Sequence, residues 1–160
     1  MENWKYMQAF ALALIRQSKN NLNITLTGEE KIMGERIAIL HLNHANELLM
    51  KSFLIKNGYV VEYLEKSDIN NGLKEADIIN STRTLDYGNC LKLVVNHLRK
   101  NGAIVDESRK QMIMDFYKIR NEIQHRATNI PLDKREKIGV FYPHLKGLYE
   151  TMFSDLMEKI

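Results

Sequence analysis

The residue types best suited to catalysis are gathered in one short segment, which runs from Arg120 to His125 with the sequence RNEIQH. An arginine has a permanent charge and a forked set of donors that suits a phosphate, and a histidine can give or take a proton near neutral pH. Cleavage of RNA by its own 2′-hydroxyl group needs these two functions when no metal ion takes part. Arg120 and His125 are therefore candidate catalytic residues.

The spacing of these two residues raises a geometric objection. Apolar residues around the segment recur at helical spacing, and residues five apart on an ideal helix are rotated by about 140°. Arg120 and His125 then do not share a face, whereas Asn121 and His125, at i and i+4, do. Either the arginine side chain curls round or the helix frays at its end. The alternative is a surface arginine and a helix-terminal histidine favoured by the helix dipole.

The segment lies in the most basic part of the chain. The net charge of +3, from 23 Lys/Arg and 20 Asp/Glu, is too small to indicate nucleic-acid binding by the whole molecule. Residues 92–137, however, contain eleven Lys or Arg and six Asp or Glu, a local charge of +5 that leaves −2 for the rest. Clustered basic charge is typical of a phosphate-binding surface, and a solvated helical face is the alternative explanation.

Other kinds of site lack the residues they need. The sequence has neither of the glycine-rich nucleotide loops and no nucleophile elbow. His41, His44 and Glu47 step by three, so they drift around a helix and indicate a polar strip rather than a metal site. Cys90, the only cysteine, begins an apolar helical face and is expected to be a buried structural thiol. We expect no metal and no cofactor.

The elements that must position these residues are helices. A chain of 160 residues with 44% hydrophobic residues suits one domain, so residues 1–160 are assigned to a single domain. The low content of glycine (8 residues) and proline (2 residues) favours an all-α fold. Apolar spacing predicts five helices, approximately over residues 4–19, 27–57, 86–100, 106–130 and 143–160.

Three local signals refine these helices. Thr27 to Glu30 has the Thr-x-x-Glu form of a capping box, and Gly58 is placed for a left-handed helix end. Pro143 suits the first turn of the last helix. Residues 59–64 are interpreted as a short extended piece and residues 65–83 as a polar excursion.

Surface properties indicate location and assembly. The longest apolar run, Ala9 to Ile15, is far shorter than the roughly 20 residues that cross a bilayer, and a single cysteine fits a reducing compartment. We therefore expect a cytoplasmic protein with no membrane partner. The last helix is apolar on two sides, from Leu145 to Ile160, which favours a second use as a subunit interface.

The segment Arg120 to His125 resembles the Arg-x4-His motif of the HEPN superfamily (higher eukaryotes and prokaryotes nucleotide-binding domains). The resemblance includes the polar residue, here Asn121, that commonly follows the arginine. Residues 44–54 (HANELLMKSFL) are similar to the alanine, glutamate, leucine and lysine pattern on the long second helix of many such domains. With the helix order, the resemblance covers the chain from about Thr27 to its C-terminus.

The resemblance implies an up-and-down helical bundle that forms a homodimer, with two motifs facing each other across a cleft. It implies a metal-independent endoribonuclease that acts on single-stranded RNA. His125 would serve as general base or acid, Arg120 would stabilise charge on the phosphoryl oxygens, and Asn121 would position His125 or the phosphate. Two copies would remove the geometric objection, because the arginine of one chain could act opposite the histidine of the other.

Neighbouring polar residues become candidates for RNA binding or support of the site: Glu47, Lys51, Tyr117, Gln124 and Arg126. For Glu47 and Lys51 the alternative is an ion pair one helical turn apart. For Tyr117 the alternative is a packed aromatic residue.

HEPN proteins commonly belong to toxin, abortive-infection or phage-defence systems, which implies a cognate antitoxin or activating partner. The sequence departs from one subgroup, in which a tyrosine two residues after the histidine is modified by an antitoxin, because Ala127 stands there. A second hypothesis is a non-catalytic HEPN-like module that binds a nucleotide, RNA or a protein. A third is a purely structural dimerisation bundle.

Overall fold

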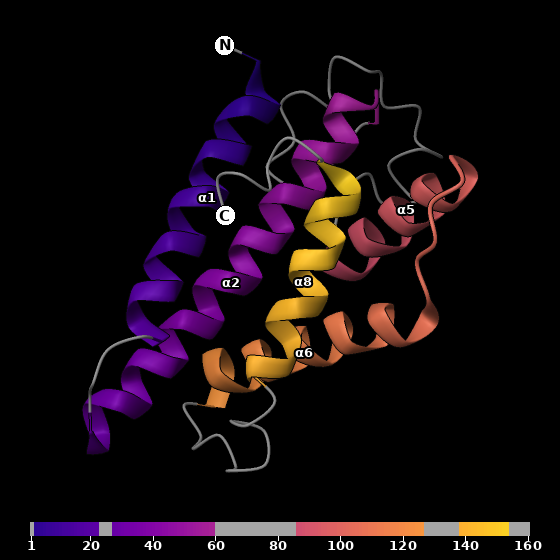
Figure 1. The fold of residues 1–160 in the computed structure, drawn as a ribbon. Coiled ribbons are helices and arrows are strands. Elements are labelled where there is room, and N and C mark those ends of the chain that lie inside the picture. Colours follow the sequence, from indigo (N-terminus) through magenta and orange to yellow (C-terminus); the bar gives the residue numbers. More distant parts are fainter. Residues whose placement is uncertain (1, 23–26, 60–85, 127–137, 154–160) are drawn as a thin grey trace, which may run out of the picture.

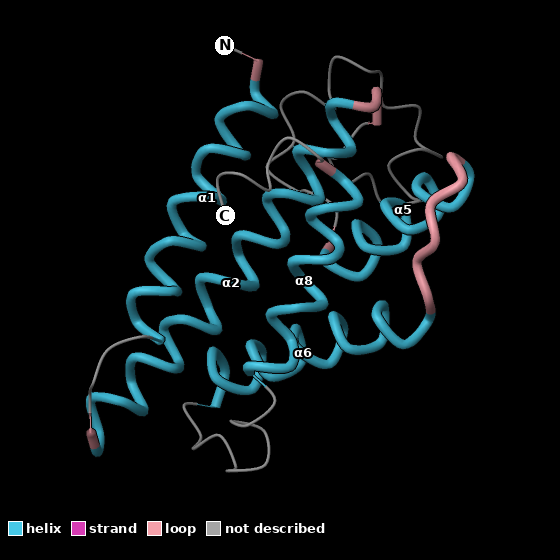
Figure 2. Tube along the Cα trace, viewed as in Figure 1, coloured by secondary structure: helices cyan, strands magenta, loops and turns pink. Residues whose placement is uncertain are grey.

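The computed structural model describes residues 2–22, 27–59, 86–126 and 138–153, and all regular structure within these ranges is helical (Figure 2). The all-α prediction is therefore confirmed. Within the same ranges no helix is long and apolar enough to cross a membrane. The polar excursion predicted over 65–83 lies outside the described residues, as does all but the first residue of the extended piece. The helices within the described ranges are α1 (Asn3–Leu22), α2 (Gly28–Lys56), α5 (Tyr87–Lys100), α6 (Glu107–Arg126) and α8 (Ile138–Met152).

Helix α2 is the centre of the fold and contacts each of the other four helices (Figure 1). It forms an antiparallel pair with α1, because the Trp4 carbonyl accepts a hydrogen bond from Ser52 Oγ at 2.9 Å while Ser18 Oγ donates to the Ala38 carbonyl at 3.3 Å. In Figure 1, α8 lies along α2, and α6 runs across both at a steep angle. Helix α6 contacts α2, α5 and α8.

The helix ends agree only in part with the local signals. Gly58 and Gly102 have φ values of 81° and 84°, so each takes the left-handed conformation that follows a helix, as the sequence predicts for Gly58. Thr27 has an extended conformation at the start of α2 but makes no side-chain cap hydrogen bond, so the capping box does not form. Glu29 and Glu30 in the first turn still interact favourably with the helix dipole.

Aspartates cap the two helices that carry the candidate site. Asp86 Oδ1 accepts from the Asn89 backbone N–H at 2.9 Å, at the start of α5. Asp106 Oδ1 accepts from the Arg109 backbone N–H at 2.7 Å, at the start of α6. Each carboxylate satisfies a donor that has no partner inside the helix, which defines where α5 and α6 begin.

The predicted start of the last helix near Pro143 is wrong. Helix α8 begins at Ile138, which places Pro143 inside it. Proline lacks an N–H and cannot donate to the Gly139 carbonyl, so the helix has one hydrogen bond fewer. The turns that follow Pro143 bury Leu145 and Leu148 completely. We infer that this packing outweighs the lost bond, which spacing alone does not reveal.

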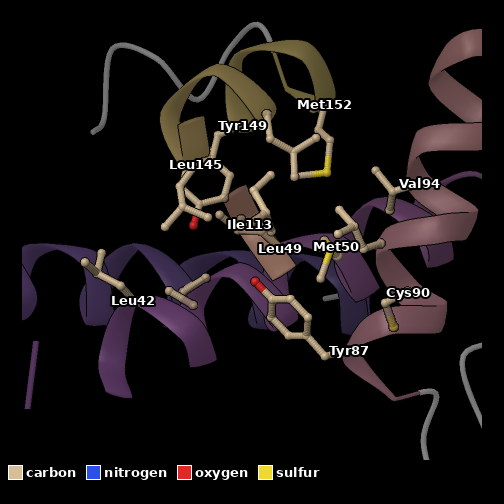
Figure 3. Packing of buried hydrophobic residues seen from close by; sticks show 14 of the residues in the cluster. Leu42, Leu49, Met50, Tyr87, Cys90, Val94, Ile113, Leu145, Tyr149 and Met152 are labelled. Carbon is tan, nitrogen blue, oxygen red and sulfur yellow. The ribbon is translucent and has the colours of Figure 1, made fainter. Parts of the chain in front are cut away.

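The described apolar residues of α8 are covered by the chain itself. Figure 3 shows Leu145, Tyr149 and Met152 directed at the core beside Ile113, and each is at most 7% exposed. These residues therefore leave no surplus apolar surface for a second subunit, and residues 154–160 lie outside the described part. Large apolar side chains that are more than half exposed occur elsewhere: Tyr6, Phe10, Met33 and Ile104.

Candidate functional site

Two neighbours on α6 hold the guanidinium of Arg120. Its Nη1 donates a 2.7 Å hydrogen bond to Oδ1 of Asn121, and its Cζ lies 5.5 Å from the centre of the Tyr117 ring. Arg120 and both neighbours are half-buried. Arginine has five N–H donors, and the bond to Asn121 uses one of them. The cation is therefore oriented on the helix while it retains donors for an anion.

Tyr117 is stacked on Tyr87, the first residue of α5. The two ring centroids are 4.2 Å apart and the planes differ by 7°. Tyr87 is only 2% exposed, and its hydroxyl oxygen accepts a hydrogen bond from Nδ2 of Asn46, a fully buried residue of α2. Figure 3 shows the Tyr87 ring in the core with its hydroxyl directed towards α2. Residues of α2, α5 and α6 therefore contact one another next to Arg120.

The pKa of Tyr87 responds to its burial and to charged residues of two helices. Burial raises the pKa of Tyr87 far above its usual range, and the charge of Glu47 raises it further. The hydrogen bond from Asn46 and the charge of Arg120 lower the pKa of the same phenol. Glu47 and Arg120, predicted from separate parts of the sequence, therefore both lie within electrostatic range of one buried hydroxyl group.

Glu47 and Lys51 form an ion pair on α2. Lys51 Nζ donates to Glu47 Oε1 at 2.6 Å, and the Lys51 side chain is only 8% exposed. Beside this pair lies Cys90, which is fully buried, as the sequence predicts. Burial raises the pKa of the Cys90 thiol to about 12, against a lowering effect of the Lys51 charge. The thiol is therefore protonated and unreactive at neutral pH.

His125 lies on the same helix as Arg120 but does not meet it. Helix α6 continues without a break to Arg126, so the helix does not fray before His125. The two side chains start about 140° apart around the axis. His125 is exposed, and in the described part of the chain Arg120 contacts Asn121 and Tyr117 rather than His125. One chain therefore brings Arg120 together with Asn121 and Tyr117 but not with His125.

The remaining predicted residues have simpler surroundings. Gln124 is exposed on α6, whereas the side chain of Arg126, the last residue of that helix, lies outside the described part. His44 contacts the Phe10 ring edge-on, with the ring centroids 5.6 Å apart. Among the described residues no three His, Cys, Asp or Glu side chains converge as metal ligands would.

Some basic side chains of residues 92–137 form ion pairs with acidic side chains of the same segment. Arg99 bonds to Glu107 at 2.8 Å, and Lys118 lies 3.5 Å from Asp115. Glu107 and Lys118 are exposed, so water screens both pairs and they stabilise the fold little. Pairing of this kind lowers the local positive charge without burying the cations, which stay accessible to a polyanion.

Two buried residues of α2 that support the candidate site were not predicted from the sequence. Asn43 and Asn46 are polar but stand on the buried side of α2, at 1% and 0% exposure. Asn43 Nδ2 donates to the Phe116 carbonyl on α6 at 3.4 Å. In an α-helix this carbonyl also accepts from the N–H of Arg120. Asparagines among the apolar residues of a helix indicate buried polar contacts. Nothing in the sequence, however, indicates that Tyr87 is the partner of Asn46.

Comparisons of the chain with models of protein families, with curated proteins and with solved structures found no match.

Proposed function

We propose that this protein is a HEPN-type endoribonuclease that cleaves single-stranded RNA without a metal ion, in the cytoplasm. The observation that carries the proposal is the orientation of the Arg120 guanidinium. Its guanidinium is oriented by Asn121 and Tyr117 on the helix that also presents an exposed histidine, His125. An oriented guanidinium binds phosphate oxygens well, and an exposed imidazole can reach a ribose hydroxyl group.

The reaction needs no co-reactant. The ribose 2′-oxygen attacks the adjacent phosphorus and its proton passes to His125, acting as general base. The bond from phosphorus to the 5′-oxygen then breaks, and His125, now protonated, gives that proton to the leaving oxygen as general acid. The products are a 2′,3′-cyclic phosphate and a 5′-hydroxyl end. Arg120 stabilises the negative charge that develops on the non-bridging oxygens. Asn121 orients Arg120 by accepting its hydrogen bond.

The active enzyme in this proposal is a homodimer. Arg120 and His125 diverge by about 140° on one helix, so one chain does not direct both at one phosphate. In a two-fold dimer, Arg120 of one copy acts opposite His125 of the other, and the symmetry makes two equivalent sites.

The biological setting follows from the resemblance. HEPN ribonucleases commonly act as toxins or in phage defence, and we extend that role, with an antitoxin or activating partner, to this protein. The second candidate is a non-catalytic module that binds a nucleotide, RNA or a protein. The separation of Arg120 from His125 within one chain is the observation that favours it.

The test uses purified protein and labelled single-stranded RNA in the presence of a chelator. We expect cleavage that leaves cyclic phosphate ends, and a loss of about 10²- to 10⁴-fold in Arg120→Ala and His125→Ala. Matched controls are Arg16→Ala and His44→Ala, which change an exposed arginine and an exposed histidine on other helices. Equal cleavage by all four variants would exclude the proposed site. RNA binding that survives His125→Ala, with no turnover, would support the second candidate.

A further inference from the structure

The side chains behind Arg120 form a continuous column from the core to the surface. Asn46 is fully buried, Tyr87 is 2% exposed, and Tyr117 and Arg120 are half-buried. Each member contacts the next: a hydrogen bond joins Asn46 to Tyr87, a ring stack joins Tyr87 to Tyr117, and a cation–π contact joins Tyr117 to Arg120. The column connects three helices, since its members come from α2, α5 and α6.

Tyr87 is the best-held member of this column. Its ring is enclosed by the core (Figure 3), its hydroxyl is bonded to Asn46, and its backbone begins α5 beside the capping residue Asp86. Because the ring is almost completely buried, the side chains packed around it restrict its orientation. The nearly parallel stack at 4.2 Å then restricts the plane of Tyr117.

Tyr117 transmits this restriction to Arg120. The guanidinium lies 5.5 Å from the Tyr117 ring centre and also donates a hydrogen bond to Asn121. The α6 backbone one turn before Arg120 is also held, because Asn43 donates a hydrogen bond to the Phe116 carbonyl. An arginine that is oriented before its ligand arrives loses less side-chain entropy when the ligand binds.

We propose that Tyr87 is a positioning residue, which sets the orientation of the Arg120 guanidinium through Tyr117. This inference rests on the proposed function of Arg120 as the group that contacts the phosphate. Tyr87 itself does not reach the phosphate, because its ring is buried beneath Tyr117. Its effect is on geometry, and a displacement of about 1 Å in a catalytic group can lower a rate by about 10²-fold.

The first measurement detects the orientation of the Arg120 side chain directly and does not depend on RNA cleavage. The Nε–Hε signal of Arg120 is assigned by NMR from its disappearance in Arg120→Lys. In the wild type we expect a signal shifted by the Tyr117 ring current and a rigid Nε–Hε bond. Tyr87→Leu and Tyr117→Leu should move the signal to the position of a free arginine and make the bond mobile. Tyr117→Phe keeps the ring and should retain the wild-type signal.

The matched control is Tyr59→Leu. Tyr59 bonds to His97 near the opposite end of α5 at 3.1 Å, so its loss disturbs the same helix without touching the column. We expect the Arg120 signal to be unchanged in this variant. Where Tyr87→Leu does not fold, Tyr87→Phe, which removes only the bond to Asn46, replaces it and should displace the Arg120 signal in the same direction.

The second measurement is RNA cleavage. We expect kcat to fall by about 10²-fold in Tyr87→Leu and Tyr117→Leu with a smaller change in KM, and Tyr117→Phe to restore it. An unchanged Arg120 signal and unchanged kcat in folded Tyr87 and Tyr117 variants would overturn the inference. Absence of cleavage by the wild type would instead refute the proposed function, and the NMR measurement would still decide whether Tyr87 positions Arg120.

Discussion

Arg120 and His125 lie on one unbroken helix, yet their side chains leave it about 140° apart. If each active site combines Arg120 of one copy with His125 of another, two inactive variants can complement each other. We expect Arg120→Ala and His125→Ala to be inactive alone and to recover about a quarter of wild-type activity when mixed in equal amounts. After exchange, half of the dimers are mixed, and each mixed dimer has one complete site of two.

The control for complementation is a mixture of Arg120→Ala with a chain that carries both substitutions, which cannot form a complete site. Sedimentation of the wild type measures the dimer independently. A mixture that stays as inactive as its components, although subunits exchange, would show that the two residues do not act across an interface.

The ion pair between Glu47 and Lys51 is expected to stabilise the fold because Lys51 is nearly enclosed. Glu47→Gln and Lys51→Met should each lower the free energy of unfolding by about 1–3 kcal/mol, as measured by urea denaturation. The double variant should lose less than the two single losses together, by about 1 kcal/mol, because each single change removes the same bond. Glu47 is 25% exposed, so water screens part of the interaction.

Glu2→Gln is the matched control for that pair. Glu2 and Lys5 lie 3.3 Å apart, but their side chains are 65% and 50% exposed, so we expect no measurable change in stability. Strictly additive losses in the Glu47 and Lys51 variants would contradict a coupled pair.

Cys90 is expected to make the protein sensitive to alkaline pH. Burial raises the pKa of its thiol to about 12 in the folded state, whereas the unfolded thiol has a pKa of about 8.5. The contribution of Cys90 to stability is therefore complete below about pH 8.5 and declines as the pH rises towards 12. Cys90→Ala should reduce the slope of unfolding free energy against pH in this window.

A direct measurement of the same property is alkylation by iodoacetamide at pH 8. The native protein should react far more slowly than the urea-unfolded protein, because only the thiolate is nucleophilic and the folded thiol is both protonated and enclosed. Equally rapid modification of native and unfolded protein would show that Cys90 is accessible.

Asp86 is expected to stabilise α5 and, with it, the position of Tyr87. Asp86→Ala removes the acceptor of the Asn89 N–H and should lower the free energy of unfolding by about 1 kcal/mol in thermal or urea denaturation. Asp86→Asn retains a side-chain oxygen in the same place and should lose little. If both variants lost the same amount, the carboxylate would act by some means other than capping.

The course of the helices was predictable because their signals are local. Apolar residues at helical spacing located all five, and the glycine at Gly58 marked the end of α2 from its backbone freedom alone. The two wrong predictions involve elements whose local signal competes with packing. Thr27 has the residue type of a capping box without its hydrogen bond, and Pro143 lies inside a helix that core contacts stabilise.

The chemical groups of the candidate site were predictable from the amino-acid sequence. Arg120, Asn121 and His125 belong to one helix, and Glu47 and Lys51 are one turn apart, so helical geometry defines the direction in which each side chain leaves its helix. The packing of the helices, which no spacing rule predicts, gives Asn46 and Tyr117 a common neighbour in the core.

That neighbour is Tyr87, which lies 41 positions from Asn46 and belongs to a different helix from Tyr117. Its contacts depend on how α2, α5 and α6 pack, and packing joins residues that no spacing rule connects. The support of Arg120 is therefore a property of the folded chain, although its chemistry is visible in the sequence.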